Sequence, residues 1–388
     1  MIPPAPPSTL DAQASPGALP TRQVPYVDLG AAHRKIKHEL LEACARVIDH
    51  GHFVLGPEVA EFEARFAALC GVKHAVACNS GTDAWVMGMQ AMGLGAGDEV
   101  ICPPNSFVAT ASGVALVGAT PTFSDIDQTY NLDPAKLEAA ITPSTKAISV
   151  VHLTGRAADM TAVQAVADRH GLDVIEDAAQ AVLAEHRGRR VGSFGRFAAF
   201  SLHPLKTLNA CGDGGVLTTD DDALAAEVRL RRNLGLESRE QCVFWSGHSR
   251  LDTMQAAMLL VKLNHLESWT QAREANAARY DARLAEIDGV TPPPSDPQGR
   301  AVYHTYVIRA DRRDALQKHL ADHGVGTGIH YPIPIHLQKC AAELPYPLGS
   351  FPTAEAQSKR ILTLPVSPEI DHDGIDYVCD RVADFYRA

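Results

Sequence analysis

No apolar run in this sequence approaches the length that a bilayer-spanning helix requires. The N-terminus has neither the basic start nor the continuous apolar stretch of a secretory signal. Basic residues are in the minority, since 35 Lys and Arg against 46 Asp and Glu give a formal net charge of −11. We therefore expect a cytoplasmic protein with no membrane partner and no nucleic-acid partner.

Paired cysteines are also missing. None of the eight cysteines forms a Cys-x-x-Cys pair, and the sequence has no His-Glu-x-x-His motif. Several cysteines lie within apolar runs, as Cys78 does at the end of 75–78. Because a chain of 388 residues can bury a large core without disulfides, the sequence predicts buried free thiols, a reducing compartment and no metal site.

The composition, with 46% hydrophobic and 21% charged residues, excludes a disordered or fibrous chain. Residues 1–23 are rich in Pro, Ala and Ser and predict a flexible N-terminal tail. From Tyr26 onward, strand-like and helix-like patterns alternate, which predicts an α/β fold whose mostly parallel sheet is covered by helices.

The chain divides into two predicted domains. A large α/β domain over 24–265 holds the predicted strands, and a smaller α+β domain follows over 266–388. The strands are expected at 73–78, 99–102, 120–123, 147–151, 172–175, 197–201 and 216–219. The helices are expected from 59 to 69, after 82, and at 106–117, 160–170, 221–234, 250–286 and 312–323, with one more opening at Pro134 and a strand at 302–309.

Ligands of open α/β sheets bind beyond the carboxyl ends of the strands, so the residues just after each strand are informative. The segment 79–83 (NSGTD) lies between a predicted strand and a predicted helix. Amides at a helix N-terminus, together with the hydroxyls of Ser80 and Thr82, can hold a phosphate. Ser and Thr are also ordinary helix caps, so both interpretations stand for this segment alone.

Two acids, Glu176 and Asp177, follow the predicted strand 172–175. They are either solvated loop residues or a carboxylate aimed at a cationic ring nitrogen. Lys206 follows another strand in apolar, glycine-flanked surroundings. It is either a surface lysine or a Schiff-base nucleophile whose pKa is lowered.

A Pro- and Gly-rich segment at 324–336 (GVGTGIHYPIPIH) carries His330, Tyr331 and His336. It is either a loop that lines a cleft or a rigid turn with surface histidines. Taken in chain order, a phosphate cradle, an acid at a strand end and a lysine five residues after Ser201 match the needs of a single cofactor. Pyridoxal 5′-phosphate requires a phosphate anchor, an anion at its ring nitrogen and a lysine at its aldehyde.

These segments resemble the DegT/StrS-type sugar aminotransferases, which belong to the fold type I pyridoxal-phosphate enzymes. The resemblance runs from about residue 24 to the C-terminus and is carried in family order by VPYVDL, NSGTDA, VHLTGRAADM, IEDAAQA, HPLKTLNACGDGG, SRLDTMQAA and GTGIHYPIPIHLQ. It implies that Lys206 holds the cofactor covalently and transfers protons, and that Asp177 pairs with the pyridine nitrogen. The further cofactor contacts that it implies are Gln180 near the phenolic oxygen, Phe107 on the ring face, and Thr82, the Asp83 backbone and Ser201 at the phosphate.

The chain departs from the family pattern at two positions. His248 stands where members usually have an Asn that reaches the cofactor phosphate of the neighbouring subunit, and His203 stands where many have Tyr. A His can still donate a hydrogen bond, so the resemblance implies a homodimer with shared active sites in which His248 binds the cofactor. We expect His203, His330 and Tyr331 to bind the sugar.

The function that this resemblance implies is transfer of an amino group, with L-glutamate as the donor, to a nucleotide-linked keto-sugar. The 326–338 segment is most similar to members that aminate C3 of a dTDP-3-keto-6-deoxyhexose. The alternatives are a cyclitol ketone aminotransferase of the aminoglycoside type and a regulatory protein that binds the cofactor without turnover. Dehydratase relatives replace the lysine with His, so Lys206 argues against that chemistry.

Overall fold

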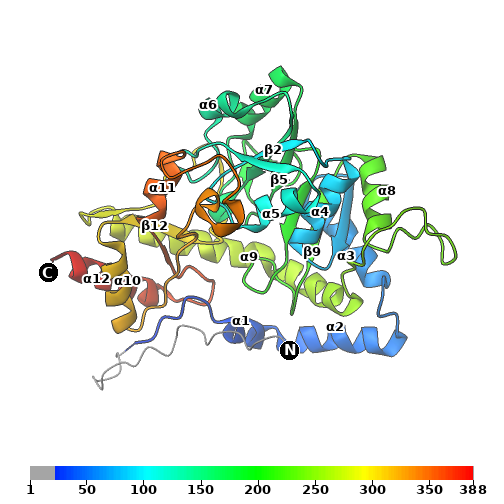
Figure 1. Cartoon of the computed structure of the whole chain (residues 1–388). Helices are drawn as coiled ribbons and strands as arrows, with labels where there is room; N and C mark the ends of the chain where they lie inside the picture. The colour runs from blue at the N-terminus through cyan, green and yellow to red at the C-terminus, as the bar shows by residue number, and fades with distance from the viewer. Residues whose placement is uncertain (1–21, 388) are drawn as a thin grey trace, which may run out of the picture.

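A seven-stranded sheet organises the larger part of the computed structural model, which describes residues 22–387 (Figure 1). The strand order is β1-β9-β8-β5-β4-β2-β3, and β9 alone in this sheet runs antiparallel to its neighbours. The strands are β1 (His74–Cys78), β2 (Glu99–Cys102), β3 (Thr120–Phe123), β4 (Thr145–Val151), β5 (Asp173–Asp177), β8 (Ala198–Ser201) and β9 (Gly215–Thr219). The predicted α/β class with a mostly parallel sheet is confirmed. The predicted tail lies outside the described residues, apart from Arg22 and Gln23.

Alternation along the strands creates two apolar faces for the sheet. In β1, Ala75 and Ala77 belong to one buried cluster, whereas Val76 and Cys78 belong to the cluster on the other face. The first cluster is completed by α3 and α9, and the second by α4, α5 and α8. Burial of both faces explains the apolar runs in strands such as β1 and β2.

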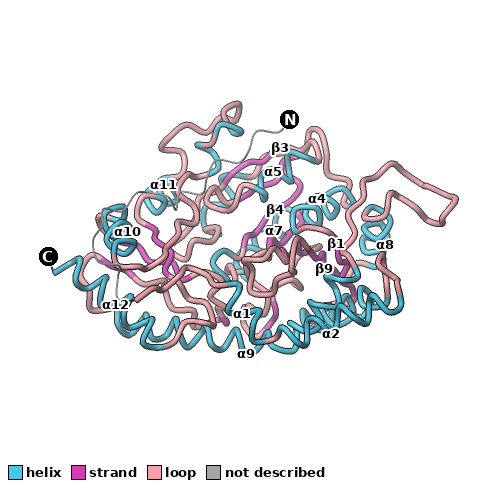
Figure 2. The backbone as a smooth tube through the Cα atoms, turned by 90° about the horizontal axis from the view of Figure 1, so that it is seen from below, coloured by secondary structure: helices cyan, strands magenta, loops and turns pink. Residues whose placement is uncertain are grey.

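The helices of the structure are α1 (Leu29–Lys35), α2 (Lys37–His50), α3 (Pro57–Cys70), α4 (Gly81–Ala91), α5 (Ala109–Leu116), α6 (Pro134–Leu137), α7 (Met160–His170), α8 (Asp222–Arg231), α9 (Thr253–Leu284), α10 (Arg313–Asp322), α11 (Pro352–Ser358) and α12 (His372–Arg387). The 32-residue α9 passes beneath the sheet toward the C-terminal region, with α2 alongside it (Figures 1 and 2). It contacts α2, α3 and α12, and it runs through the predicted boundary at residue 265. This one helix therefore contributes to the core on one face of the large sheet and to the separate core of the C-terminal part.

The C-terminal part has its own core around β12 (Tyr306–Ala310) and β13 (Ile361–Leu364), which pair with each other and with β10 (Val290–Thr291). Helices α10 and α12 pack against these strands, as does Tyr280 of α9. Val24, near the N-terminal end of the described residues, joins the same core. A separate small sheet joins β6 (Glu185–His186), β7 (Arg189–Arg190) and β11 (Gly299–Arg300).

Several sequence predictions need correction. The helix predicted at 106–117 begins only at Ala109, and the strand predicted at 302–309 begins at Tyr306. All eight cysteines are free, but Cys211, Cys242 and Cys340 are exposed, so the prediction of buried thiols holds for only part of the set. Cys211 and Cys242 lie in loops and Cys340 lies in a short 3₁₀ helix, all three at the surface.

Candidate active site

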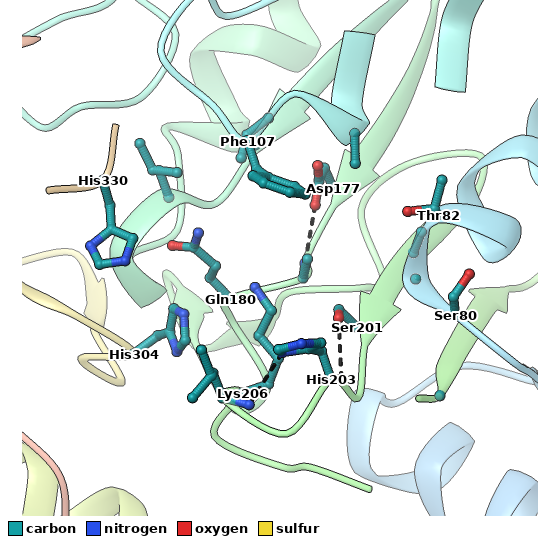
Figure 3. Close-up of a pocket in the computed structure, with 18 of the residues that line it drawn as sticks. Ser80, Thr82, Phe107, Asp177, Gln180, Ser201, His203, Lys206, His304 and His330 are labelled. Atoms are coloured by element: carbon teal, nitrogen blue, oxygen red, sulfur yellow. Dashed lines mark hydrogen bonds between the residues drawn. The ribbon is translucent and has the colours of Figure 1, made fainter. Parts of the chain in front are cut away.

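A cavity of about 370 Å³ opens at the carboxyl ends of β5 and β8, beside the N-terminus of α4 (Figure 3). Most of the residues predicted for the site line it together: Thr82, Phe107, Asp177, Gln180, Ser201, His203, Lys206, His330 and Tyr331. The first seven come from the large sheet and its loops, and the last two come from the segment that follows α10. The fold thus brings together groups that are up to about 250 residues apart in the sequence.

The N-terminus of α4 forms one wall of this cavity. Ser80 caps the helix, and its hydroxyl accepts a hydrogen bond from the Asp83 amide at 3.1 Å. The Asp83 amide is therefore engaged in the cap, and its contact with a phosphate stays a prediction. The Gly81 and Thr82 amides come before the first intrahelical hydrogen bond and make none within the described chain, so they are the donors available to an anion.

Gly81 lets this helix end approach β8 closely. A Cβ atom at this position would lie 2.9 Å from the Cα and Cβ atoms of Ser201, closer than such atoms can pack. Absence of a side chain therefore places the Thr82 hydroxyl, the free amides and Ser201 around one space. The Asp83 side chain turns away to accept a hydrogen bond from Ser249 at 2.7 Å, and Asp83 does not line the cavity.

Asp177 and Glu176, although adjacent, point to opposite sides of the sheet. Asp177 lines the cavity, where Oδ2 accepts a hydrogen bond from the Thr110 hydroxyl at 2.6 Å and Oδ1 accepts one from the Ala179 amide at 3.1 Å. These bonds orient the carboxylate toward a ligand. Glu176 is completely buried on the other side, so it is not a solvated loop residue.

Lys206 projects into the cavity from the loop after β8 (Figure 3). Burial of the ammonium group lowers its pKa to about 8, while attraction to Asp177 opposes that change. At neutral pH about a tenth of such amines are unprotonated, compared with far fewer for a surface lysine. The sequence pattern left Lys206 open between a surface lysine and a nucleophile, and its position here favours the nucleophile.

Gln180 and Phe107 border the space between Asp177 and Lys206. The Gln180 carbonyl accepts a hydrogen bond from the Thr154 amide at 2.7 Å, which leaves its amide group toward Tyr331, whose hydroxyl lies 3.4 Å away. The Phe107 ring is 54% exposed, and it lines the cavity at 5.6 Å from the ring centre of Tyr331. An exposed aromatic face at this position suits stacking on a flat ring.

Three histidines were expected at the site, and two of them line the cavity. His330 donates or accepts a hydrogen bond with Thr363 at 2.8 Å, and burial, with a smaller contribution from Lys206, lowers its pKa to about 4. His203 lies at the mouth and is exposed. His248 is exposed on the loop between α8 and α9 and does not line this cavity, so it does not contact a ligand bound by the same chain.

Tyr26, Thr110, Arg273 and His304 were not predicted. All but Thr110 line the cavity, while Thr110 bonds to Asp177. Arg273 lies in the middle of α9 among other polar residues, and His304 just precedes β12, so neither carries a local signal. His336, expected in the same loop as His330, instead pairs with Glu355 at 3.1 Å and is buried away from the cavity.

The donor set fits pyridoxal phosphate. Free amides and hydroxyls at a helix N-terminus suit its phosphate, Asp177 suits its ring nitrogen, and Lys206 suits its aldehyde. Within residues 22–387, no three His, Cys, Asp or Glu side chains are grouped closely enough to hold a metal ion. The helices of that same range include none with the length and apolarity needed to cross a membrane.

A lysine, a carboxylate and a helix N-terminus around one cavity of a mostly parallel sheet are typical of the α/β enzymes that use pyridoxal phosphate. The sequence model of the DegT/DnrJ/EryC1/StrS aminotransferase family matches residues 34–383. This chain belongs to that family.

Curated relatives with different names match nearly the whole chain. The erythromycin biosynthesis sensory transduction protein EryC1 of Saccharopolyspora erythraea is 45% identical, over 92% of this chain and 97% of its own length. The dTDP-3-amino-3,4,6-trideoxy-alpha-D-glucose transaminase of Streptomyces venezuelae is 43% identical, over 94% and 97%. The UDP-2-acetamido-2-deoxy-3-oxo-D-glucuronate aminotransferase of Pseudomonas aeruginosa is 41% identical, over 92% and 98%.

Solved structures agree with the fold. DesV of S. venezuelae, in complex with a ketimine intermediate, superposes with a TM-score of 0.93 at 43% identity, covering 95% of this chain and 100% of DesV. NtdA of Bacillus subtilis, with bound cofactor PMP, superposes with a TM-score of 0.87 at 31% identity, covering 94% of this chain and 86% of NtdA. The family depends on pyridoxal phosphate, and this chain is an aminotransferase.

Proposed function

We propose that this enzyme transfers the amino group of L-glutamate to the ketone carbon of a nucleotide-linked keto-sugar, with pyridoxal phosphate as cofactor. The observation that carries the proposal is Lys206, an amine of lowered pKa that faces Asp177 across a cavity bounded by the free amides of α4. Relatives named as dTDP-sugar and UDP-sugar aminotransferases, at 41–43% identity, support the acceptor class.

Each side chain has a distinct task in this proposal. Thr82, Ser201 and the amides at the start of α4 hold the phosphate, and Phe107 covers one ring face. Asp177 keeps a proton on the ring nitrogen, and the hydrogen bond from Thr110 holds the Asp177 carboxylate in place. When bound, the cofactor supplies an electron sink that stabilises negative charge at the carbon losing its proton. Lys206 would take that proton and return it at the cofactor carbon that carried the aldehyde.

We assign the sugar pocket to His203, His330 and Tyr331, which line the cavity together. His330 lies on the opposite side of it from Thr82 of α4 (Figure 3). The lowered pKa of His330 keeps its imidazole neutral at neutral pH. A neutral imidazole and a phenol can each donate and accept hydrogen bonds, which suits sugar hydroxyls. Among the sugars, we favour a dTDP-3-keto-6-deoxyhexose; a UDP-linked 3-keto-sugar is the nearest alternative, because a UDP-sugar relative matches almost as well.

We further propose a homodimer in which His248 of one subunit reaches the cofactor phosphate of the other. His248 is exposed on a loop that projects from the body (Figures 1 and 2), and nearby Trp245 is 96% exposed. A large aromatic side chain so exposed is typical of a residue that a partner covers. The closed two-fold dimer is the commonest soluble assembly.

A mixing experiment tests the shared site. A Lys206→Ala chain and a His248→Ala chain are each expected to have low activity. If the subunits share sites, mixed dimers carry one site with both lesions and one intact site, so activity is expected to return to about half the wild-type value per mixed dimer. No recovery, with mixed dimers confirmed by native mass spectrometry, would place the whole site within one chain.

The catalytic proposal is tested by following the absorption of the bound cofactor. Addition of L-glutamate is expected to replace the aldehyde-form band with the amine-form band, and addition of the keto-sugar nucleotide is expected to restore it. Mass spectrometry of the sugar products then separates dTDP from UDP acceptors and from a cyclitol ketone. Because EryC1 is named a sensory transduction protein, a regulatory role is the second candidate; a spectrum that glutamate does not change would favour it.

A further inference from the structure

Arg273 of α9 carries a positive charge into the cavity that contains Lys206. Its Nη1 atom donates to the backbone carbonyls of Tyr303 at 3.2 Å and His304 at 3.4 Å. No carboxylate oxygen of residues 22–387 lies within the 4.0 Å of an ion pair from its guanidinium. The two carbonyls fix the position of the side chain, but neither supplies a negative charge to pair with its own.

The surroundings of Arg273 make this charge costly. Burial lowers the pKa of the guanidinium to about 10, although attraction to Glu369 opposes the change. The other ionisable neighbours do not supply a negative charge at neutral pH. Burial raises the pKa of Tyr26 to about 12, and burial together with nearby cations keeps His304 neutral. Within residues 22–387 no carboxylate is in ion-pair contact with this cation, and Glu369 attracts it only from beyond 4.0 Å, so the site can take an anionic ligand.

The size of the cavity decides which anion fits. About 370 Å³ has to hold the cofactor and the reacting part of each substrate, which leaves the nucleotide outside. Arg273 and Lys206 also line a second, smaller cavity of about 40 Å³, so the two side chains share both cavities. The carboxylate of a small amino acid can reach this position, whereas the diphosphate of a nucleotide sugar is tied to the mouth by its nucleoside.

We propose that Arg273 binds a carboxylate of the amino donor and so selects amino acids as donors. This inference rests on the proposed function for its donor. The guanidinium offers two parallel N–H groups to a carboxylate, a geometry that Lys cannot reproduce. Because Tyr303 and His304 fix one nitrogen, little side-chain freedom is lost when the donor binds.

The test measures binding as well as turnover. Glutarate, which has the carboxylates of glutamate but no amine, is titrated into the holoenzyme by calorimetry. Arg273→Gln is expected to weaken glutarate binding roughly 10- to 100-fold, as loss of a charge-assisted pair implies. Arg273→Lys is expected to retain only part of the wild-type affinity for glutarate. Arg283→Gln is the matched control, because Arg283 lies on the same helix but pairs with Asp376 and Asp380 at the surface.

Rate measurements separate the donor from the acceptor. The rate with L-glutamate is expected to fall with Arg273→Gln, while the return reaction with keto-sugar stays within about 2-fold of wild type. Equal glutarate affinity in wild type and Arg273→Gln overturns the inference, as does a loss confined to the keto-sugar reaction. A drop in melting temperature with glutarate affinity unchanged assigns Arg273 a structural role. If no keto-sugar reacts with the wild type, the proposed acceptor fails, whereas glutarate binding still decides the role of Arg273.

Discussion

Exchange of Glu176 for Gln is predicted to destabilise the fold without altering the chemistry of the site. Four N–H groups point at the two carboxylate oxygens of Glu176. The Phe194 and Gly195 amides donate to Oε1 at 2.7 and 2.8 Å, and the Gly192 amide donates to Oε2 at 2.9 Å. The fourth is His152, whose Nε2 lies 3.0 Å from Oε2.

The proton on this histidine can be assigned from its second contact. The Ala158 amide donates to Nδ1 of His152 at 3.1 Å, so Nδ1 carries no proton and the neutral ring is protonated at Nε2. All four groups around Glu176 are therefore donors, and none can turn to accept. Gln offers one oxygen and one NH₂ group, so in either orientation two buried donors face another donor.

Loss of two hydrogen bonds to a charged group, at about 1.5–3 kcal/mol each, predicts a destabilisation of about 3–6 kcal/mol. Asp177→Asn is the matched control, since it makes the same change of acid to amide one residue later. The Asn oxygen can still accept from the Ala179 amide, and the Thr110 hydroxyl can rotate to accept from the new NH₂ group. Asp177→Asn should therefore keep its stability and lose most of its activity.

The assay is urea unfolding followed by circular dichroism, together with the absorption change that glutamate causes. Glu176→Gln should unfold at a clearly lower urea concentration and, where still folded, react with glutamate at close to the wild-type rate. Wild-type stability of Glu176→Gln would refute the hydrogen-bond argument. Normal turnover of Asp177→Asn with cofactor bound would refute the assignment of the ring-nitrogen partner.

Three further predictions concern the cavity. Lys206→Ala should bind the cofactor through the remaining phosphate contacts but lose transamination, and borohydride reduction should label Lys206 in the wild type, as peptide mapping would show. Gly81→Ala should weaken cofactor binding measured by equilibrium dialysis, because its Cβ would lie 2.9 Å from Ser201; wild-type affinity would contradict the proposed phosphate cradle. His330 has a pKa of about 4 when folded and 6.5 when unfolded, so the unfolded chain binds its proton first as the pH falls. Stability should therefore rise from pH 4 to 6.5 by about 2–3 kcal/mol, and an equally steep rise in His330→Gln would exclude this cause.

Local patterns in the sequence were sufficient for much of the sheet and for the cofactor contacts. Strands such as 99–102 and 120–123 were predicted at their observed bounds, because each is a short segment that lies between turn signals and ends in buried residues. Lys206 and Asp177 were found because Asp177 stands at the carboxyl end of β5 and Lys206 lies in the loop after β8, and parallel strands bring such positions to one edge. Chain order alone then linked them to a single cofactor.

Only the tertiary structure decided how these groups are oriented. Whether the Asp83 amide faces a ligand or the Ser80 hydroxyl depends on the cap geometry of α4, and Glu176 differs from Asp177 only in which side of the sheet it faces. The role of Arg273 had no local signal, because a charged residue in a long helix is ordinary in sequence. It becomes informative only when packing places the guanidinium in the same cavity as Lys206 with no carboxylate of the described residues in ion-pair contact, a consequence of contacts distant in the chain.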